Sequence, residues 1–376
     1  MKHPFQSYRQ LFPVLSSHIH VGSCSQGAVS RPVSAAIEEY HRSLLQHGHN
    51  GDLSMARLEE ARGHFAKLIG AEPDEIAVLS SASEAIAGVA TALPYVPGKE
   101  GIVYADTDFP TVGHIWQAQE MFHDHICCIP SIEGEVTIEQ YEEHVTEKTA
   151  LVMVSQVNYT NGFQQDLKSI ADIAHRKQAL LFVDAYQSAG IVPVDVKAMG
   201  VDILVAGARK YMLGIPGVAF LYVSKDRIDR FKPRLTGWLG QEPASRFDIA
   251  HPVPAAGARR FETGLPSFIS IFAANAALKL LLEIGVTNIQ AYMSELLDFS
   301  VEYGRRKGLH IRVPYRGGTL PSLLAVEVAD VSAVERNLRS QNMIVSARKD
   351  VIRVAPHFYN TAEEVRRVID ELAGRC

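Results

Sequence analysis

The feature that most constrains this chain is a repeated alternation of short apolar runs with amphipathic helical runs, from about residue 30 to 230. Strand–helix units in series favour a largely parallel sheet with helices on both faces. Ligands of such sheets gather at the carboxyl ends of the strands. The predicted fold class is therefore α/β, with the chemistry expected at that edge of the sheet.

The periodicity gives the expected elements and their limits. Expected strands are 76–79, 101–104, 150–154, 180–183, 203–205 and 218–223, and expected helices are 32–46, 53–68, 84–93 and 167–176. After about residue 267 a long apolar helix, 267–283, leads to a second helix, 289–307, and then to short strands and a final amphipathic helix, 361–372. This change predicts a small α+β domain. We expect an N-terminal segment at 1–25, a large domain at 26–266 and a small C-terminal domain at 267–376.

Length and composition limit the class of protein. The chain has 376 residues, 47% apolar and 21% charged, which suits a packed protein of one large and one smaller domain. A net charge of −5, a pI near 6.3 and the lack of a basic stripe argue against nucleic acid and membrane surfaces as partners.

The same sequence bears on the compartment. No apolar run reaches the roughly 18 residues of a membrane span, and the first residues lack the apolar stretch of a secretory leader. Of the four cysteines, two are adjacent and one is terminal, so they form no disulfide framework. We therefore expect a cytoplasmic protein.

Two polar residues follow buried strand-like runs. Asp184 ends the run 180–183, and Lys210 comes shortly after the run 203–205. Taken alone, the aspartate is interpreted as a helix cap or a loop residue, and the lysine is interpreted as a solvated loop residue. A carboxylate at a buried strand end is costly unless a cation meets it. Together, an amine and a carboxylate at neighbouring strand ends are what pyridoxal 5′-phosphate (PLP) requires, as Schiff-base partner and as acid facing the ring nitrogen.

A turn of small residues, 80–83, runs directly into the expected helix 84–93. A helix start presents free N–H groups and a positive dipole end, which suit a phosphate. The alternative is an ordinary serine N-cap followed by Glu84. A nucleotide site at this turn would need a glycine-rich loop, which the sequence lacks.

Several ordered motifs resemble the class V aminotransferase family. The segment 183–196, VDAYQSAGIVPVDV, carries the likeness, together with 207–217, GARKYMLGIPG, and 353–361, RVAPHFYNT. Segments 57–62, 71–76 and 260–266 support it, so it spans nearly the whole chain. The family has PLP fold type I and includes cysteine desulfurases, selenocysteine lyase, isopenicillin N epimerase-like proteins and kynureninase.

The resemblance implies a role for each cofactor residue. Lys210 matches the Schiff-base lysine, Asp184 matches the partner of the pyridinium nitrogen, and Gln187 matches the side chain that hydrogen-bonds the ring oxygen O3′. Ala82 and Ser83 match the phosphate-binding turn.

Other positions match with changed residue types. Phe109 lies where the family stacks a ring on the cofactor, with a core phenylalanine as the alternative. Arg209 occupies a phosphate-binding position, where it would be a charge-assisted donor. Gly264 and Leu265 match a segment that reaches the phosphate from a second subunit, although Leu265 replaces the usual polar residue. A homodimer with shared active sites is implied.

The substrate residues follow in the same way. Arg353 matches the arginine that binds the substrate α-carboxylate with its planar fork, with a surface arginine as the alternative. His20, Asn158 and Trp238 lie on segments that face the substrate of relatives, and the N-terminal segment is expected near the active-site mouth. Those segments also hold His18, Ser23, Ser25, Gln26 and Asn161.

The implied reaction begins with an external aldimine and a quinonoid formed on a small amino acid, with Lys210 as the base. Persulfide-forming desulfurases need a cysteine before the carboxylate-binding arginine, and 340–349 contains none. Segments 235–242 and 246–248 resemble kynureninase, but Arg209, Val112 and Leu265 depart from it. The prediction is an aminotransferase; the alternatives are a β-eliminating lyase, C–S or kynureninase-like, and a racemase.

Two further hypotheses receive little support. A non-catalytic protein of this fold would not need intact Lys210, Asp184 and Arg353. A metal site at His123 and His125 with Cys127 and Cys128 fits no standard zinc spacing, so an exposed turn before a strand is expected and no metal.

Overall fold

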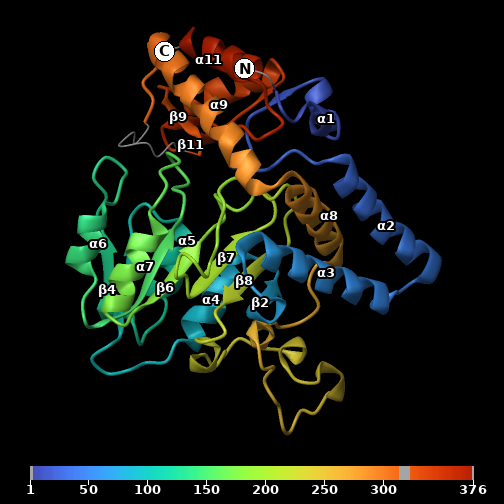
Figure 1. The fold of residues 1–376 in the computed structure, drawn as a ribbon, viewed down its shortest axis with the longest axis vertical. Helices are drawn as coiled ribbons and strands as arrows, with labels where there is room; N and C mark the ends of the chain where they lie inside the picture. Colours follow the sequence, from blue (N-terminus) through green and yellow to red (C-terminus); the bar gives the residue numbers. More distant parts are fainter. Residues whose placement is uncertain (1–2, 313–321, 375–376) are drawn as a thin grey trace.

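The computed structural model describes residues 3–312 and 322–374. Met1, Lys2 and Cys376, which entered the arguments on a leader and on the cysteines, lie outside the described residues. Figure 1 shows a large body built on a sheet, with a smaller body above it that holds both ends of the chain.

The large sheet has seven strands in the order β2-β8-β7-β6-β5-β3-β4. All its neighbouring strands pair in parallel except β8, which is antiparallel to both β7 and β2. The carboxyl ends of the other six strands therefore lie at one edge. The strands are β2 Ile76–Leu79, β3 Gly101–Ala105, β4 Ile126–Ile129, β5 Thr149–Ser155, β6 Leu180–Asp184, β7 Ile203–Gly207 and β8 Ala219–Val223.

Helices cover both faces of this sheet. Within β6, Leu180 and Phe182 belong to one buried cluster, while Leu181 and Val183 belong to another on the opposite face. Because side chains alternate along a strand, a continuous apolar run packs into two cores. Helices α4 Ala82–Ala92 and α5 Pro110–Gln117 line one core, and α3 Gly51–Ile69, α6 Ile138–His144 and α7 Leu167–Arg176 line the other. Helix α8, Phe268–Ile284, packs on α3 and on α2, Arg31–His47.

The smaller body combines the C-terminal region with the start of the chain. Its three-stranded antiparallel sheet has the order β11-β12-β9, and β1 pairs in parallel with β10. The strands are β1 Ile19–His20, β9 Leu324–Glu327, β10 Met343–Ile344, β11 Ser346–Arg348 and β12 Val351–Val354. The helices are α1 Gln6–Arg9, α9 Val286–Arg306, α10 Val331–Ser340 and α11 Ala362–Ala373.

The prediction of an α/β fold with a mostly parallel sheet is confirmed, and each expected strand and helix is present to within a few residues. Helices α5 and α6 were not placed from the sequence, and the strand expected after the turn at His123 and His125, which is β4, was given no bounds. The division at residue 267 stays a prediction, since α8 packs on helices of the large body and one buried cluster runs through both bodies. No single described helix is both long and apolar enough to cross a membrane; α8 and α9 pass that test only as a pair, bent by 76°.

A buried histidine joins the two bodies beside the expected site. His357 Nε2 lies 2.9 Å from the Tyr211 carbonyl, and Nδ1 lies 2.8 Å from the Phe358 N–H. A carbonyl only accepts and an N–H only donates, so the neutral ring carries its proton on Nε2. Burial lowers the pKa of His357 to about 4.

This histidine predicts a loss of stability in acid. The native pKa lies below the ordinary 6.5, so the stabilisation is complete above pH 6.5 and is lost as pH falls towards 4. The loss is about 3 kcal/mol. We expect His357→Gln to lower the unfolding free energy at pH 7. As pH falls, the wild type should lose this stabilisation, so the unfolding free energies of the two proteins should approach each other. Denaturant unfolding from pH 7.5 to 4.5 measures this, and His47→Gln, at an exposed ring, is the control. Parallel pH curves would contradict it.

Candidate active site

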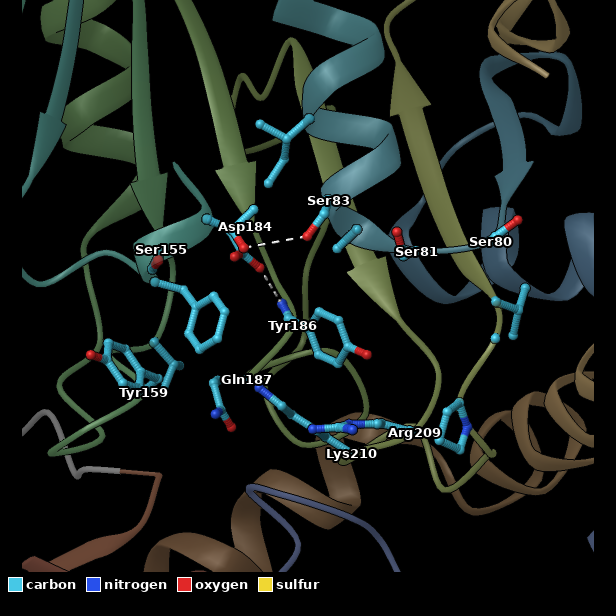
Figure 2. A pocket seen from close by; sticks show the side chains of 18 residues that line it. Ser80, Ser81, Ser83, Ser155, Tyr159, Asp184, Tyr186, Gln187, Arg209 and Lys210 are labelled. Atoms are coloured by element: carbon cyan, nitrogen blue, oxygen red, sulfur yellow. Dashed lines mark hydrogen bonds between the residues drawn. The ribbon is translucent and has the colours of Figure 1, made fainter. Parts of the chain in front are cut away.

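A cavity of about 280 Å³ opens at the carboxyl edge of the large sheet. Figure 2 shows side chains that enter it from the ends of several strands. Seven of the predicted site residues line it: Ala82, Ser83, Phe109, Asp184, Gln187, Arg209 and Lys210. The sheet topology brings them together, because β2, β3, β6 and β7 all end at this edge.

Lys210 reaches the cavity from the loop after β7. Its Nζ lies 4.4 Å from the centre of the Tyr186 ring and 5.8 Å from that of Phe109. Burial lowers the pKa of the amine to about 8, against the opposing charge of Asp184. A lysine with this pKa is partly unprotonated near neutral pH, which a nucleophilic amine requires.

Asp184 ends β6 and is buried beside the amine. One of its oxygens accepts a hydrogen bond from the Tyr186 N–H at 2.8 Å. Burial raises the pKa of this carboxyl, while the Tyr186 N–H and the Lys210 charge lower it. A buried carboxylate in this position favours a cationic partner in the cavity.

The start of α4 forms the anion-binding end of the cavity. Ser81 caps the helix by accepting from the Glu84 N–H at 3.1 Å, which leaves the N–H groups of Ala82 and Ser83 without helical acceptors. The Ser83 hydroxyl lies 3.3 Å from that of Thr111. Arg209 lines the same cavity, and its Nε is buried without a hydrogen-bond partner among the described residues. A phosphate fits this end.

Gln187 departs in detail from its expected role. Its Nε2 donates to the Cys24 carbonyl at 3.1 Å, and its Oε1 is buried with no partner in the described part of the chain. The carbonyl of Cys24 can only accept, so the amide orientation is fixed. The atom left for a ligand is an acceptor, which suits a ring hydroxyl that keeps its proton.

Arg353 is buried close to the cavity but does not line it. Its Nη1 donates to the Tyr159 carbonyl at 2.7 Å, and its Nη2 donates to Ser346 at 2.6 Å and to Ser25 at 3.2 Å. Its Nε has no partner among the described residues. Its charge lowers the pKa of Lys210, so the guanidinium lies within electrostatic reach of the amine.

The other predicted residues are not brought to this cavity within one chain. His20 lines a separate pocket, and burial lowers its pKa to about 4. The Asn158 side chain is engaged by the protein itself: its Oδ1 accepts from the N–H of Thr160 at 2.7 Å, and its Nδ2 donates to the Gly134 carbonyl at 3.3 Å. Trp238, Gly264 and Leu265 are exposed on the surface. Their roles in binding stay predictions.

Some side chains at or next to the site were given no role from the sequence, among them Tyr186, Tyr159 and Asp108. Tyr186 and Tyr159 line the cavity, and the Tyr186 ring lies next to the Lys210 amine (Figure 2). Asp108 accepts from the N–H of Ala105 at 2.8 Å and of Ser155 at 2.6 Å, so it ties β3 to β5 beside Phe109. Burial raises the pKa of Asp108 to about 6. The signal for Tyr186 was its place between Asp184 and Gln187.

The arrangement fits PLP on the evidence of its own groups. An amine and a buried carboxylate share one cavity, a helix start and Arg209 supply anion donors, and Gln187 offers a free polar atom. No group of His, Cys, Asp and Glu that could hold a metal occurs in the described ranges, and His123–His125 is a short helical turn before β4. The fold and site define a fold type I PLP-dependent enzyme.

Comparisons with known proteins agree with this class. The model of the family described as Aminotransferase class-V matches residues 27–368. The chain is 48% identical to an uncharacterized aminotransferase, YcbU, of Bacillus subtilis, covering 100% of this chain and 99% of the relative. It is 28% identical to a kynureninase of Deinococcus radiodurans, over 78% of this chain and 73% of the relative. A solved C-DES mutant with glycine covalently linked to its PLP cofactor has TM-score 0.87 at 20% identity, over 98% and 99% of the two chains.

The chain belongs to the class V aminotransferase family. It is an enzyme of that family, and its cofactor is pyridoxal 5′-phosphate. The predictions of family, fold type I, enzyme and cofactor are therefore confirmed.

Proposed function

We propose that the chain is an amino-acid aminotransferase in which Lys210 carries PLP. One observation carries the proposal: the Lys210 amine, its pKa lowered to about 8, shares a buried cavity with the Asp184 carboxylate. Asp184 ends β6, and Lys210 lies in the loop after the neighbouring parallel strand β7, so both side chains enter the cavity from the same edge of the sheet.

The side chains divide the work of holding the cofactor. When bound, PLP supplies an electron-accepting ring. Asp184 would hold a proton on the ring nitrogen, and Phe109 would pack on the ring face. The N–H groups of Ala82 and Ser83, with Arg209, would bind the phosphate. Gln187 would accept a hydrogen bond from the ring hydroxyl.

Lys210 would also move the substrate proton. Among the described residues that line the cavity, Lys210 supplies the only amine, and none is a cysteine or a histidine. Transamination needs one base that takes a proton from the substrate Cα and delivers it elsewhere on the same face. A cavity with a single amine supports this reaction, and the 48% identical relative carries the name aminotransferase.

The test is incubation of the PLP-loaded protein with single amino acids. We expect the visible absorbance of the cofactor to fade with an active amino acid and to recover only on addition of a keto acid. Release of pyruvate and ammonia, with the absorbance unchanged after turnover, would instead establish a lyase. No response to any amino acid would remove the proposal.

A β-eliminating lyase is the second candidate, because several relatives are kynureninases at 25–28% identity. A C–S lyase is a further form of it. Kynurenine and cystine therefore belong in the amino-acid panel. Formation of alanine from kynurenine, or of pyruvate from cystine, would favour this candidate over the aminotransferase.

Arg353 is proposed to bind the substrate carboxylate through the donors that its protein partners leave free. We expect Arg353→Lys to raise KM about 10- to 100-fold, because a point charge loses the charge-assisted pair that a planar fork makes. Steady-state kinetics measure this, and an unchanged cofactor absorbance shows that the site is intact. An unchanged KM would exclude this role.

We also propose a homodimer with shared active sites. Apolar side chains stand exposed on the segment 235–265, which extends away from the body at the bottom of Figure 1. They include Trp238, Phe247, Leu265 and Ile249, the last 99% exposed. Burial of such a patch against a second copy would remove it from water. Light scattering tests the dimer, and Leu265→Asp should yield monomers with weakened cofactor binding.

The cytoplasm is the proposed location. Among the described cysteines, Cys24, Cys127 and Cys128 are free, as expected for a reducing compartment. Fractionation of cells that express the tagged chain tests this location.

A further inference from the structure

The Tyr186 ring lies close to the Lys210 amine and has no part in the reaction proposed above. The ring centre lies 4.4 Å from Nζ, nearer than the Phe109 ring at 5.8 Å. Within the described residues, Nζ makes no hydrogen bond or ion pair. The face of an aromatic ring attracts a cation at this distance. The amine and the face of the Tyr186 ring therefore make a cation–π contact.

The position of this ring depends on a glycine in the next strand. A Cβ at Gly207, the last residue of β7, would lie 2.2 Å from Tyr186 Cζ and 2.4 Å from its hydroxyl oxygen. Gly207 is in a strand and pairs with Ala219 of β8, so its backbone does not require glycine. The missing side chain makes room for the tyrosine ring.

Tyr186 also contacts the Asp184 carboxylate. Its N–H donates to Asp184 Oδ1 at 2.8 Å. One residue thus fixes the carboxylate through its backbone and meets the amine with its ring. Figure 2 shows the Tyr186 ring near both Asp184 and Lys210, to one side of the space between them.

We infer that Tyr186 is a positioning residue, whose ring, admitted by Gly207, holds the Lys210 amine on the Asp184 side of the cavity. The inference rests on the proposed function, because it takes Lys210 as the cofactor-binding amine. Tyr186 and Gly207 act as a size-matched pair, and enlarging the glycine displaces the ring.

Four other groups act on the same amine. Asp184 at the end of β6 and Cys24 of the N-terminal segment raise the pKa of Lys210, while Arg353 of β12 and Arg209 before the lysine lower it. All four stay in place when only the Tyr186 ring is changed. A change in the pH at which Lys210 titrates can then be attributed to the loss of the ring.

The experiment compares Tyr186→Leu with Tyr186→Phe in the full chain without cofactor. Leucine fills space and excludes water but has no π face, whereas phenylalanine keeps the face. The readout is the pH dependence of Lys210 acetylation by acetic anhydride, followed by mass spectrometry of its peptide. With leucine we expect the midpoint to move to lower pH by about half to one unit, and the rate at pH 7 to rise roughly two- to fivefold. Phenylalanine should leave both unchanged.

Gly207→Ala tests the second half of the pair. We expect its added methyl to displace the ring and to give the same pH dependence of Lys210 acetylation as Tyr186→Leu. The double variant Gly207→Ala with Tyr186→Leu should show no further shift of the midpoint. Gly63→Ala, where an added Cβ meets nothing within 4 Å, is the matched control. Thermal unfolding checks that each variant folds; if Gly207→Ala does not, the two Tyr186 variants still decide the question.

The outcomes separate this inference from the proposed function. A leucine variant with the wild-type profile, or additive shifts in the double variant, would overturn the role of Tyr186. Acetylation needs no cofactor, so this result is independent of PLP. Capture of PLP on Lys210, fixed by borohydride and located by mass spectrometry, tests the proposed function separately.

Discussion

Replacement of Lys210 by alanine is expected to abolish covalent capture of PLP and to lower turnover by at least about 10³-fold. Among the described residues that line the cavity, Lys210 supplies the one amine, and burial brings its pKa to about 8, so no other described lining residue can form the Schiff base. Borohydride reduction followed by mass spectrometry measures the attachment, and transamination with the best amino acid measures the turnover.

The control for this variant is Lys225→Ala. Lys225 lies in the turn after β8 with its side chain 74% exposed, and it pairs only loosely with Asp74 at 3.4 Å. We expect this variant to capture PLP and to turn over as the wild type does. If Lys210→Ala kept a reducible linkage or more than a tenth of the activity, the cofactor would have to be attached elsewhere.

The sheet could be predicted from the sequence because its strands are buried on both faces. A run such as 180–184 is wholly apolar until its last residue, and its side chains fill two cores. Buried runs of this kind are local signals. Strand β4 was given no bounds from the sequence, because Ile126–Ile129 includes two cysteines and is only partly buried at the sheet edge.

The site could be predicted where chemistry and local position coincide. Asp184 and Lys210 each follow a recognisable strand, so their meeting follows from the order of strands. The direction of the Tyr186 ring could not be predicted, since it depends on a glycine in a neighbouring strand. The orientation of Gln187 likewise depends on the carbonyl of Cys24, 163 residues away in the sequence. Such contacts leave no periodicity to read.

The exposed residues show a different limit. Gly264 and Leu265 carry a predicted role that involves a second subunit, so a single chain leaves them at the surface. The Thr263 hydroxyl donates to Glu84 of α4 at 3.1 Å, which holds this segment near the phosphate end of its own chain. In a dimer whose two anion-binding cavity ends face each other, Gly264 and Leu265 of one subunit would lie at the interface with the other.

Asp184→Asn is expected to lower kcat by about 10²- to 10³-fold with little loss of stability. The Tyr186 N–H donates to Asp184 at 2.8 Å, and an asparagine oxygen can accept the same hydrogen bond, so the backbone turn is kept. Its NH₂ group, however, would donate to the ring nitrogen and leave it unprotonated, which weakens the ring as an electron acceptor. Turnover with the best amino acid measures this, beside Asp166→Asn, an exposed helix cap at which asparagine serves equally. Activity within tenfold of the wild type would mean that the carboxylate does not face the ring nitrogen.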